Sequence, residues 1–513
     1  MRKRKLLVMV ILFFMTLVLP ISGIGETTSE ASGKGKYFTA GKLYYHTLSG
    51  SKVEVCGTKK TTGTLTIPAN VTYKGKKYRV TKIADYEIYS QSGISENNGS
   101  ETNITVGDGL YYRYDRVDGK SMPGNVDWIA GSGITRVVLP GSITYIGNGA
   151  FNGCSKLKTV SFAKSYKKLT VGENVFGGTK LKSLVFPKGT YELKDGAAGT
   201  VSDITIPASV KKIGAGVVNY KTKKVTINKK NSNFKMKNGI MYSKDEKVLY
   251  GASSKTPKQI KISAKTTKIM AKAFYNAKAS EIILNDRISY IPEGAFCGCA
   301  GLVNVGKTDN ITSIGYGAFA DCPKLQDIGS MPKLGSIERA AFWKDKSLKL
   351  NISETVKNVS DYAFSGTEYQ TMPKAVNVSA GNRQLSIIDG FLVKTEGAEK
   401  TVILQTSDAK KIKLPEGITR IAVCLGNYTC EEISLPATLM VQDGGFRLNN
   451  GSVTFNGGKV PEFGAEFGMY GVKTVYVPKS KLDEYRNAMD AVVEKRDDTK
   501  LFDENFGPVI RGY

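Results

Sequence analysis

The feature that most constrains this chain is a short internal repeat. Five phenylalanines, Phe274, Phe296, Phe319, Phe342 and Phe364, follow one another at intervals of 22, 23, 23 and 22 residues. Phe151 has the same surroundings, and each of the six has isoleucine or valine five residues earlier. A unit of this length cannot bury its own apolar side chains, so neighbouring units must stack into a continuous core. The repeat therefore predicts a solenoid, with one supersecondary unit per coil.

Short segments inside each repeat alternate apolar and polar residues. Examples are VVLP, ITIP, VTIN and EIIL, which begin at residues 137, 204, 225 and 281. Alternation with period two is typical of a strand with one buried face. We therefore expect one short strand per coil, and a parallel sheet along one side of the solenoid.

Cysteine usage fits the repeat better than it fits a metal site. Cys154, Cys299 and Cys322 each lie three residues after a repeat phenylalanine, and only Cys297 in the same neighbourhood is out of frame. A small thiol suits a crowded interior turn. A structural zinc site needs four Cys or His ligands in paired spacing, whereas this chain has a single histidine, His46. We expect a buried column of cysteines, and neither metal nor cofactor.

The combination of I-x-L-P, I-G-x-x-A-F and G-C-x-x-L resembles the BspA-like leucine-rich repeats of bacterial surface proteins. Residues 63–88 resemble that family's opening segment, 234–253 its inserted hairpin, 387–394 a weaker second hairpin, and 472–493 its closing module. The resemblance implies a β-rich α/β leucine-rich-repeat solenoid with 22–23-residue coils, short parallel strands, an N-terminal β cap, an inserted β-hairpin and a C-terminal helical cap. It also implies roles in adhesion or host contact, without binding residues that transfer position by position.

The chain divides into segments that follow this pattern. Four basic residues at 2–5 precede the apolar run 6–19, which is too short to cross a bilayer and is typical of a secretory signal peptide. We expect a signal peptide at 1–25, an N-terminal β cap with a first degenerate coil at 26–88, a polar and aromatic insertion at 89–132, repeat block 1 at 133–232, an inserted hairpin at 233–262, repeat block 2 at 263–371, degenerate repeats at 372–450 and a capping module at 451–513.

The C-terminal cap is expected to be helical. Ser480 and Asp483 have the spacing of a capping box. Apolar side chains recur at helical spacing at Leu482, Tyr485, Met489 and Val492. This stripe favours a helix packed on the last coil over a helix that binds a partner.

Catalytic motifs are scarce. His46 is the only imidazole, which removes His-dependent triads from most of the chain. The stretch GENVFGGT at 172–179 has Gly178-Thr179 where a phosphate loop requires Lys followed by Ser or Thr. Glycoside hydrolysis needs only two carboxylates and stays formally open, but no tract is built for it. We expect no enzyme.

Positive charge is concentrated in the middle of the chain. The formal net charge is +27, and residues 156–280 hold 27 lysines, no arginine and six acidic residues, a net charge of +21. The outward positions beside core residues include Lys158, Lys182, Lys212, Lys224 and Lys268. Lysine acts as a point charge without arginine's bidentate fork, which favours diffuse attraction over sequence-specific nucleic-acid binding. The partners predicted are a protein, an acidic glycan or an anionic wall polymer; a merely solvated surface is the alternative.

A second candidate surface is the 89–132 insertion. Tyr111, Tyr112, Tyr114 and Trp128 are amphipathic rings of the kind found in recognition surfaces, although such rings also fold onto a neighbouring coil. The sequence therefore predicts an exported, non-catalytic binding protein, secreted or retained non-covalently at the cell surface, with a role in adhesion or host contact. The alternative function is an envelope structural protein held to anionic wall polymer by its lysines.

Overall fold

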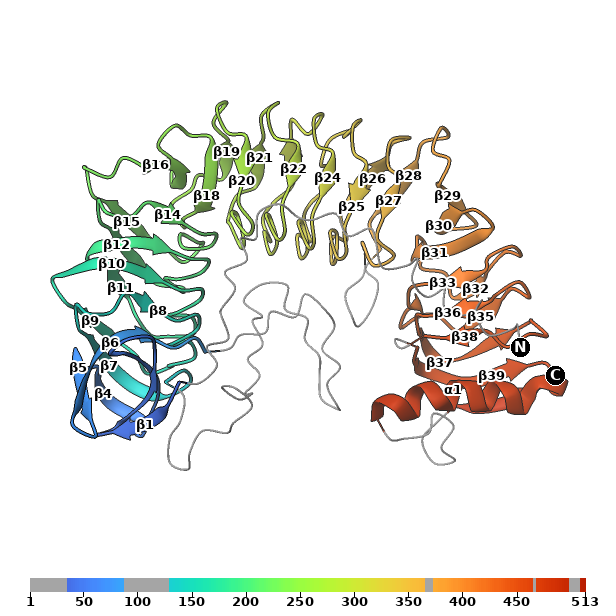
Figure 1. Ribbon diagram of the computed structural model, residues 1–513. Coiled ribbons are helices and arrows are strands. Elements are labelled where there is room, and N and C mark those ends of the chain that lie inside the picture. Colours follow the sequence, from blue (N-terminus) through green and yellow to red (C-terminus); the bar gives the residue numbers. More distant parts are fainter. Residues whose placement is uncertain (1–34, 87–128, 365–371, 465–466, 498–507) are drawn as a thin grey trace, which may run out of the picture.

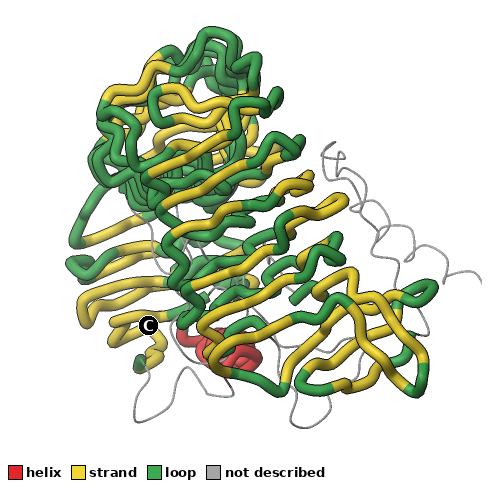
Figure 2. Tube along the Cα trace, turned by 90° about the vertical axis from the view of Figure 1, so that its left-hand side faces the viewer, coloured by secondary structure: helices red, strands yellow, loops and turns green. Residues whose placement is uncertain are grey.

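The structure, a computed structural model, describes residues 35–86, 129–364, 372–464, 467–497 and 508–513. Its coils stack into an arch, with β1 to β15 in one arm and β29 to β40 in the other (Figure 1). The expected signal peptide lies outside the described residues. Two ladders of strands run along the stack, and their strands lie side by side from coil to coil in Figure 2.

Ladder B contains the longer strands, which come from the alternating segments of the sequence. Its members are parallel and in register, so that Leu184, Ile204 and Val225 of three successive coils are direct neighbours. The strands are β4 (Thr62–Thr66), β7 (Gly133–Leu139), β9 (Thr159–Phe162), β11 (Ser183–Val185), β13 (Asp203–Ile206), β15 (Lys224–Ile227), β19 (Gln259–Lys261), β21 (Glu281–Ile283), β23 (Asn304–Gly306), β26 (Lys349–Ile352), β28 (Ala375–Val378), β32 (Lys411–Lys413), β34 (Leu425–Gly426), β35 (Glu432–Leu435), β37 (Phe446–Phe455), β39 (Met469–Val477) and β40 (Val509–Gly512).

Ladder A is a second series of parallel strands, so the expectation of one strand per coil was wrong. The segment that ends at each repeat isoleucine also pairs with its neighbours, as Ile291, Ile314 and Ile337 show. The strands are β8 (Tyr145–Ile146), β10 (Ser165–Val171), β12 (Lys188–Leu193), β14 (Lys212–Ile213), β20 (Lys268–Ile269), β22 (Tyr290–Ile291), β24 (Ser313–Ile314), β25 (Ser336–Ile337), β27 (Asn358–Val359), β33 (Arg420–Ile421), β36 (Val441–Gln442) and β38 (Glu462–Phe463). Most of them contain two residues, too few to show a period of two in the sequence.

The N-terminal cap is built of β-strands, as expected. Its strands are β1 (Tyr37–Ala40), β2 (Leu43–Thr47), β3 (Lys52–Thr58), β5 (Asn70–Tyr73) and β6 (Lys76–Ile83). β1, β2 and β3 pair antiparallel, and β3 then pairs parallel with β6, which pairs parallel with β8. The sheet of the cap is therefore antiparallel at its outer end and parallel where it joins ladder A.

The repeat phenylalanines form a stacked column inside the solenoid. All six are fully buried, and the ring centroids of Phe296 and Phe319 lie 5.1 Å apart, those of Phe319 and Phe342 5.7 Å apart. The cysteine column is also confirmed: Cys154, Cys299 and Cys322 are buried, and the Sγ of Cys299 donates to the carbonyl oxygen of Phe274 over 3.0 Å. None of the seven cysteines forms a disulfide.

Three coils in the first arm lack the full motif in the sequence. Phe176 stacks on Phe151 with centroids 5.7 Å apart, and the next two coils have Ala198 and Val218 at the equivalent buried positions. Smaller side chains occupy the phenylalanine column in these two coils. The regular spacing of phenylalanines in the sequence therefore stops here, although the coils themselves continue.

Two antiparallel meanders interrupt the array. The first comprises β16 (Phe234–Lys237), β17 (Ile240–Ser243) and β18 (Val248–Ala252), and the second β29 (Leu385–Ile388), β30 (Phe391–Glu396) and β31 (Glu399–Gln405). Each meander lies where one buried core meets the next. In the first, Met241 packs in the core of the preceding coils and Tyr242 in that of the following coils, because successive strand residues point to opposite faces.

The C-terminal cap is a helix packed on the last coils, as expected. α1 (Leu482–Asp497) follows the single 3₁₀ turn η1 (Lys479–Lys481), and its Tyr485 and Met489 are fully buried in the last core. The expected capping box was wrong: Ser480 lies inside η1, which Pro478 starts, and its side chain forms no hydrogen bond with Asp483 in the described part of the chain.

Candidate binding surface

The lysine belt, defined here as the surface of residues 156–280, lies entirely within the described residues and extends over the coils from β9 to β20. Lys158, Lys182, Lys212, Lys224 and Lys268 are all exposed. Lys158 and Lys182 immediately precede β9 and β11, and Lys224 begins β15, so these three belong to ladder B. Lys212 and Lys268 begin β14 and β20 of ladder A. The structure thus divides the five lysines between two sides of the solenoid and does not bring them into one row.

Few of these lysines are neutralised by neighbouring acids. Among the described residues, five of the 27 have a carboxylate within ion-pair distance. Of the five predicted site lysines only Lys212 is among them, and its Nζ lies 3.9 Å from Glu192. An exposed ion pair of this kind stabilises the fold by about 0–1 kcal/mol. Most of the positive charge of the belt is therefore not neutralised within the protein and can attract an anionic ligand.

One acidic residue of the belt is fully engaged. Glu246, in the turn between β17 and β18, binds Lys235 and Lys237 with N–O distances of 2.7 and 3.0 Å, and accepts a hydrogen bond from Ser263. The hydrogen bonds from Lys235, Ser263 and Lys237 lower the pKa of Glu246 to about 2. This carboxylate stabilises the meander and does not repel an anion elsewhere on the belt.

Three belt lysines lie over tyrosine rings; one of them is Lys221, whose Nζ is 5.5 Å from the ring centroid of Tyr220. The Nζ of Lys168 is 4.4 Å from the ring centroid of Tyr191, and that of Lys194 is 5.9 Å from the centroid of Tyr145. A cation over a ring face gains about 0.5–1 kcal/mol at an exposed site. The contacts of Lys168 and Lys194 place two positive charges on ladder A.

A small cleft of about 190 Å³ lies between the first meander and β19. Its lining combines the side chains of Lys237, Asn238, Gln259, Lys261 and Ser263 with apolar residues. It is too small to enclose a polymer, because sites for drug-sized ligands occupy about 300–1,000 Å³. The belt therefore offers an extended surface and not an enclosed pocket.

The four predicted aromatic residues, Tyr111, Tyr112, Tyr114 and Trp128, lie outside the described residues. The prediction that they bind a ligand stays a prediction. His46 lies in the N-terminal cap, where its Nδ1 is 2.8 Å from Glu54 and its ring stacks on Tyr37. The described residues contain no group of three or more His, Cys, Asp or Glu side chains that could hold a metal ion.

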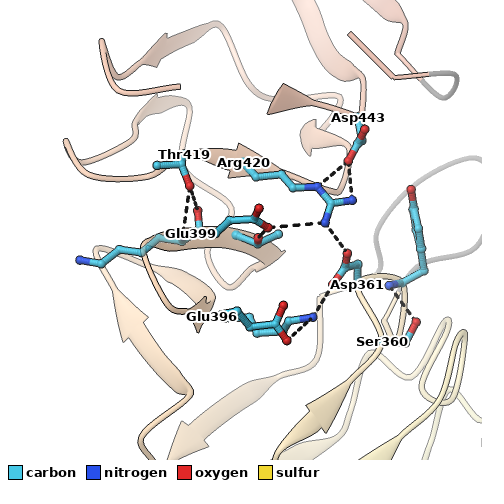
Figure 3. Close-up of polar contacts among 11 residues, drawn as sticks. Ser360, Asp361, Glu396, Glu399, Thr419, Arg420 and Asp443 are labelled. Carbon is cyan, nitrogen blue, oxygen red and sulfur yellow. Dashed lines mark hydrogen bonds and ion pairs between the residues drawn. The ribbon is translucent and has the colours of Figure 1, made fainter. Parts of the chain in front are cut away.

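Sequence reasoning missed a cluster of charged side chains at the second meander. Arg420 of β33 lies between Asp361, Glu399 and Asp443, and Lys394 of β30 contacts Asp361 and Glu396 (Figure 3). The members come from coils up to 82 residues apart, so no local motif links them. We call Asp361, Lys394, Glu399, Arg420 and Asp443 the charged clamp; it joins the coils on either side of the meander.

Stacked coils, paired parallel ladders and a buried phenylalanine column define a leucine-rich-repeat solenoid. Residues 125–245 and 252–371 match the family model of the BspA type leucine rich repeat region, in six copies, so the repeats in these two ranges belong to this family. No helix among the described residues has the length and apolar character needed to span a membrane.

Solved structures similar to this chain come from several bacteria. A leucine rich cell surface protein of Faecalibacterium prausnitzii is 19% identical with a TM-score of 0.42, over 68% of this chain and 96% of that one. The pneumococcal vaccine antigen PcpA is 17% identical with a TM-score of 0.38, over 93% and 99%. A leucine-rich repeat protein of Eubacterium ventriosum is 17% identical with a TM-score of 0.40, over 68% and 95%. A search of curated proteins returns no match.

Proposed function

We propose that this protein is an exported, non-catalytic binding protein that holds an anionic macromolecule on the lysine belt. The observation that carries the proposal is the net charge of +21 on residues 156–280, most of it on side chains without an acidic partner. Contiguous sequence is contiguous surface in a solenoid, so the charge covers neighbouring coils on both ladders.

The chemistry of the belt favours an extended polyanion. The ammonium group of lysine is a compact, strongly hydrated charge. The belt has no arginine, which could form bidentate hydrogen bonds with one carboxylate or phosphate group. Clustered like charges create a potential of several kT that attracts polyanions, and salt screens it beyond about 10 Å at 0.1 M. Acidic glycans and anionic wall polymers fit this mode of binding, whereas base-specific reading of nucleic acid does not.

Two biological uses follow from the same surface. As an adhesin, the protein is secreted or held at the cell surface without a covalent bond and contacts a host macromolecule. As an envelope structural protein, it is held to its own wall polymer by the belt. The leucine-rich cell surface protein among the similar structures supports a surface location for both.

Salt extraction of intact cells separates attachment through the belt from other modes of retention. Cells that produce the protein are washed in about 0.15 M and then about 1 M NaCl, at which the Debye length falls to about 3 Å, and both washes are probed with antibody. Release in the high-salt wash supports attachment through the belt. Retention through that wash contradicts it, and release in the first wash supports a secreted protein that acts elsewhere.

A further inference from the structure

The last coils expose aromatic side chains at a site far from the lysine belt. Tyr428 is 70% exposed and Tyr470 is 57% exposed. The guanidinium carbon of Arg447 lies 4.9 Å from the ring centroid of Tyr428 and 5.2 Å from that of Tyr470. We call these three side chains the tyrosine platform. It lies in the arm formed by β29 to β40, whereas the belt lies mainly in the opposite arm (Figure 1).

Strand register creates the platform. Gly426 of β34 is the neighbour of Arg447 in β37, and Arg447 is the neighbour of Tyr470 in β39. Tyr428 follows Gly426 by two residues, so the three side chains come from three successive coils. Parallel strands are separated by about 4.8 Å, and the two rings therefore stand about two strand spacings apart with the cation between them.

The backbone beneath the platform is shaped to present these side chains. Strands β37 and β39 change register between Arg447 and Gly451, and bulges of this kind re-aim side chains. At Gly468 an added Cβ would lie 3.1 Å from the ring of Tyr470, so a larger residue there would displace the ring by a few tenths of an ångström. Arg447 is half-buried; its guanidinium donates a hydrogen bond to the Tyr428 hydroxyl and contacts the partly buried Cys424 thiol.

The surroundings of the platform are polar. Thr429, Asn449 and Asn450 are exposed. Asn449 lies two residues after Arg447 in β37, within the register change. In the described part of the chain neither asparagine side chain makes a hydrogen bond. Exposed tyrosines and an arginine also occur in protein interfaces, but isolated ring faces beside amides that make no hydrogen bond suit a ligand with alternating C–H faces and hydroxyl groups.

We infer that the tyrosine platform binds a saccharide chain, with sugar rings stacked on Tyr428 and Tyr470. Arg447 fixes both rings and supplies positive charge between them, so a sugar that carries a carboxylate binds more tightly than a neutral one. Asn449 donates and accepts hydrogen bonds with hydroxyl groups. This site is separate from the belt and does not depend on it.

The test is calorimetric titration of the full chain in about 0.5 M NaCl, which screens the belt. The probes are a neutral chitin hexasaccharide and a carboxylate-bearing hyaluronan octasaccharide. The double variant Tyr428→Ala/Tyr470→Ala is expected to bind roughly tenfold or more weakly than the unmodified chain. Tyr428→Phe/Tyr470→Phe keeps the rings and the affinity. Tyr290→Ala, at an exposed tyrosine of ladder A, is the matched control and changes nothing.

Three results would overturn the inference. The first is that neither probe binds at millimolar concentration. The second is that the double variant binds as tightly as the unmodified chain. The third is that sedimentation shows a dimer that the double variant abolishes, in which case the platform contacts a second copy of the chain. Unchanged thermal unfolding shows that a loss of affinity is not a loss of fold, because both rings are exposed.

Discussion

The guanidinium of Arg420 lies 3.1 Å from the Oδ2 of Asp361, although 59 residues separate them. The other side of the same guanidinium lies 2.7 Å from Asp443. Because Asp361 precedes the second meander and Asp443 lies two coils beyond it, one side chain connects both parts of the array (Figure 3). The charged clamp is the structural reason to treat these two parts as mechanically coupled.

Replacing Asp361 by alanine should loosen this connection. Arg420 and Lys394 each lose a partner in a partly buried environment, and a hydrogen bond to a charged group contributes about 1.5–3 kcal/mol. We expect amide hydrogen exchange in β30, β31 and β33 to become roughly tenfold faster or more. Glu431→Ala is the control, since its pair with Lys410 is exposed and should contribute under about 1 kcal/mol. Equal exchange in the two variants would contradict the role of the clamp.

The phenylalanine column predicts that truncation of Phe319 to alanine will lower the free energy of unfolding strongly. Phe319 is fully buried between Phe296 and Phe342, and Phe→Ala substitutions in cores cost about 3–5 kcal/mol. Hydrogen exchange of β22, β24 and β25 should report this loss, whereas Phe319→Leu should cost less because it leaves a smaller cavity. A cost below about 1 kcal/mol for the alanine variant would show that the column does not hold the coils together.

Asp345 predicts a specific dependence of stability on pH. It lies three residues after Phe342, in the cysteine column, and its Oδ1 accepts a hydrogen bond of 2.8 Å from the backbone N–H of Cys322. The Oδ2 atom is buried without a hydrogen-bond partner among the described residues. Burial raises the pKa of Asp345 well above its ordinary value, and the nearby Asp321 and Cys299 add to the rise.

The direction of this pH dependence follows from the number of protons that the folded and the unfolded chain bind at Asp345. Below the unfolded pKa of about 3.9, both states hold the proton. Above it the unfolded chain releases the proton and the folded chain retains it, so the free energy of unfolding falls with rising pH until the folded pKa is reached. Between about pH 4 and 7, hydrogen exchange around Cys322 should therefore accelerate in the unmodified chain after correction for the intrinsic exchange rate. Asp345→Asn should remove this contribution, and an identical pH trend in both proteins would refute it.

Much of the fold could be predicted because the repeat places one residue type at one position in many coils. The phenylalanine interval gave the coil length, and the cysteine offset gave the buried column. Ladder A was missed because strands of two residues, such as Tyr290–Ile291, carry no periodicity. Phe176 was missed because the two coils that follow it carry Ala198 and Val218 at the same position, so the phenylalanine interval does not continue.

The candidate sites were less predictable for a different reason. The exposure of the belt lysines follows from their place beside core residues, but their division between two ladders depends on which strand each one begins. The charged clamp and the tyrosine platform bring together residues from different coils. Their sequence separations exceed any local motif, and only the strand register reveals them.

The most direct test of the proposed function compares two variants with the same change in net charge. One replaces five belt lysines by glutamine, at Lys158, Lys182, Lys212, Lys224 and Lys268. The other replaces five exposed lysines outside the belt, at Lys324, Lys346, Lys349, Lys357 and Lys413. The measurement is the dissociation constant for a purified phosphodiester wall polymer in about 0.05 M NaCl, where the Debye length exceeds 10 Å.

We predict that the belt variant binds roughly tenfold or more weakly and depends less steeply on salt, while the other variant stays close to the unmodified chain. Equal affinity of the two variants would contradict the proposal, because it would mean that total charge, and not the belt, determines binding.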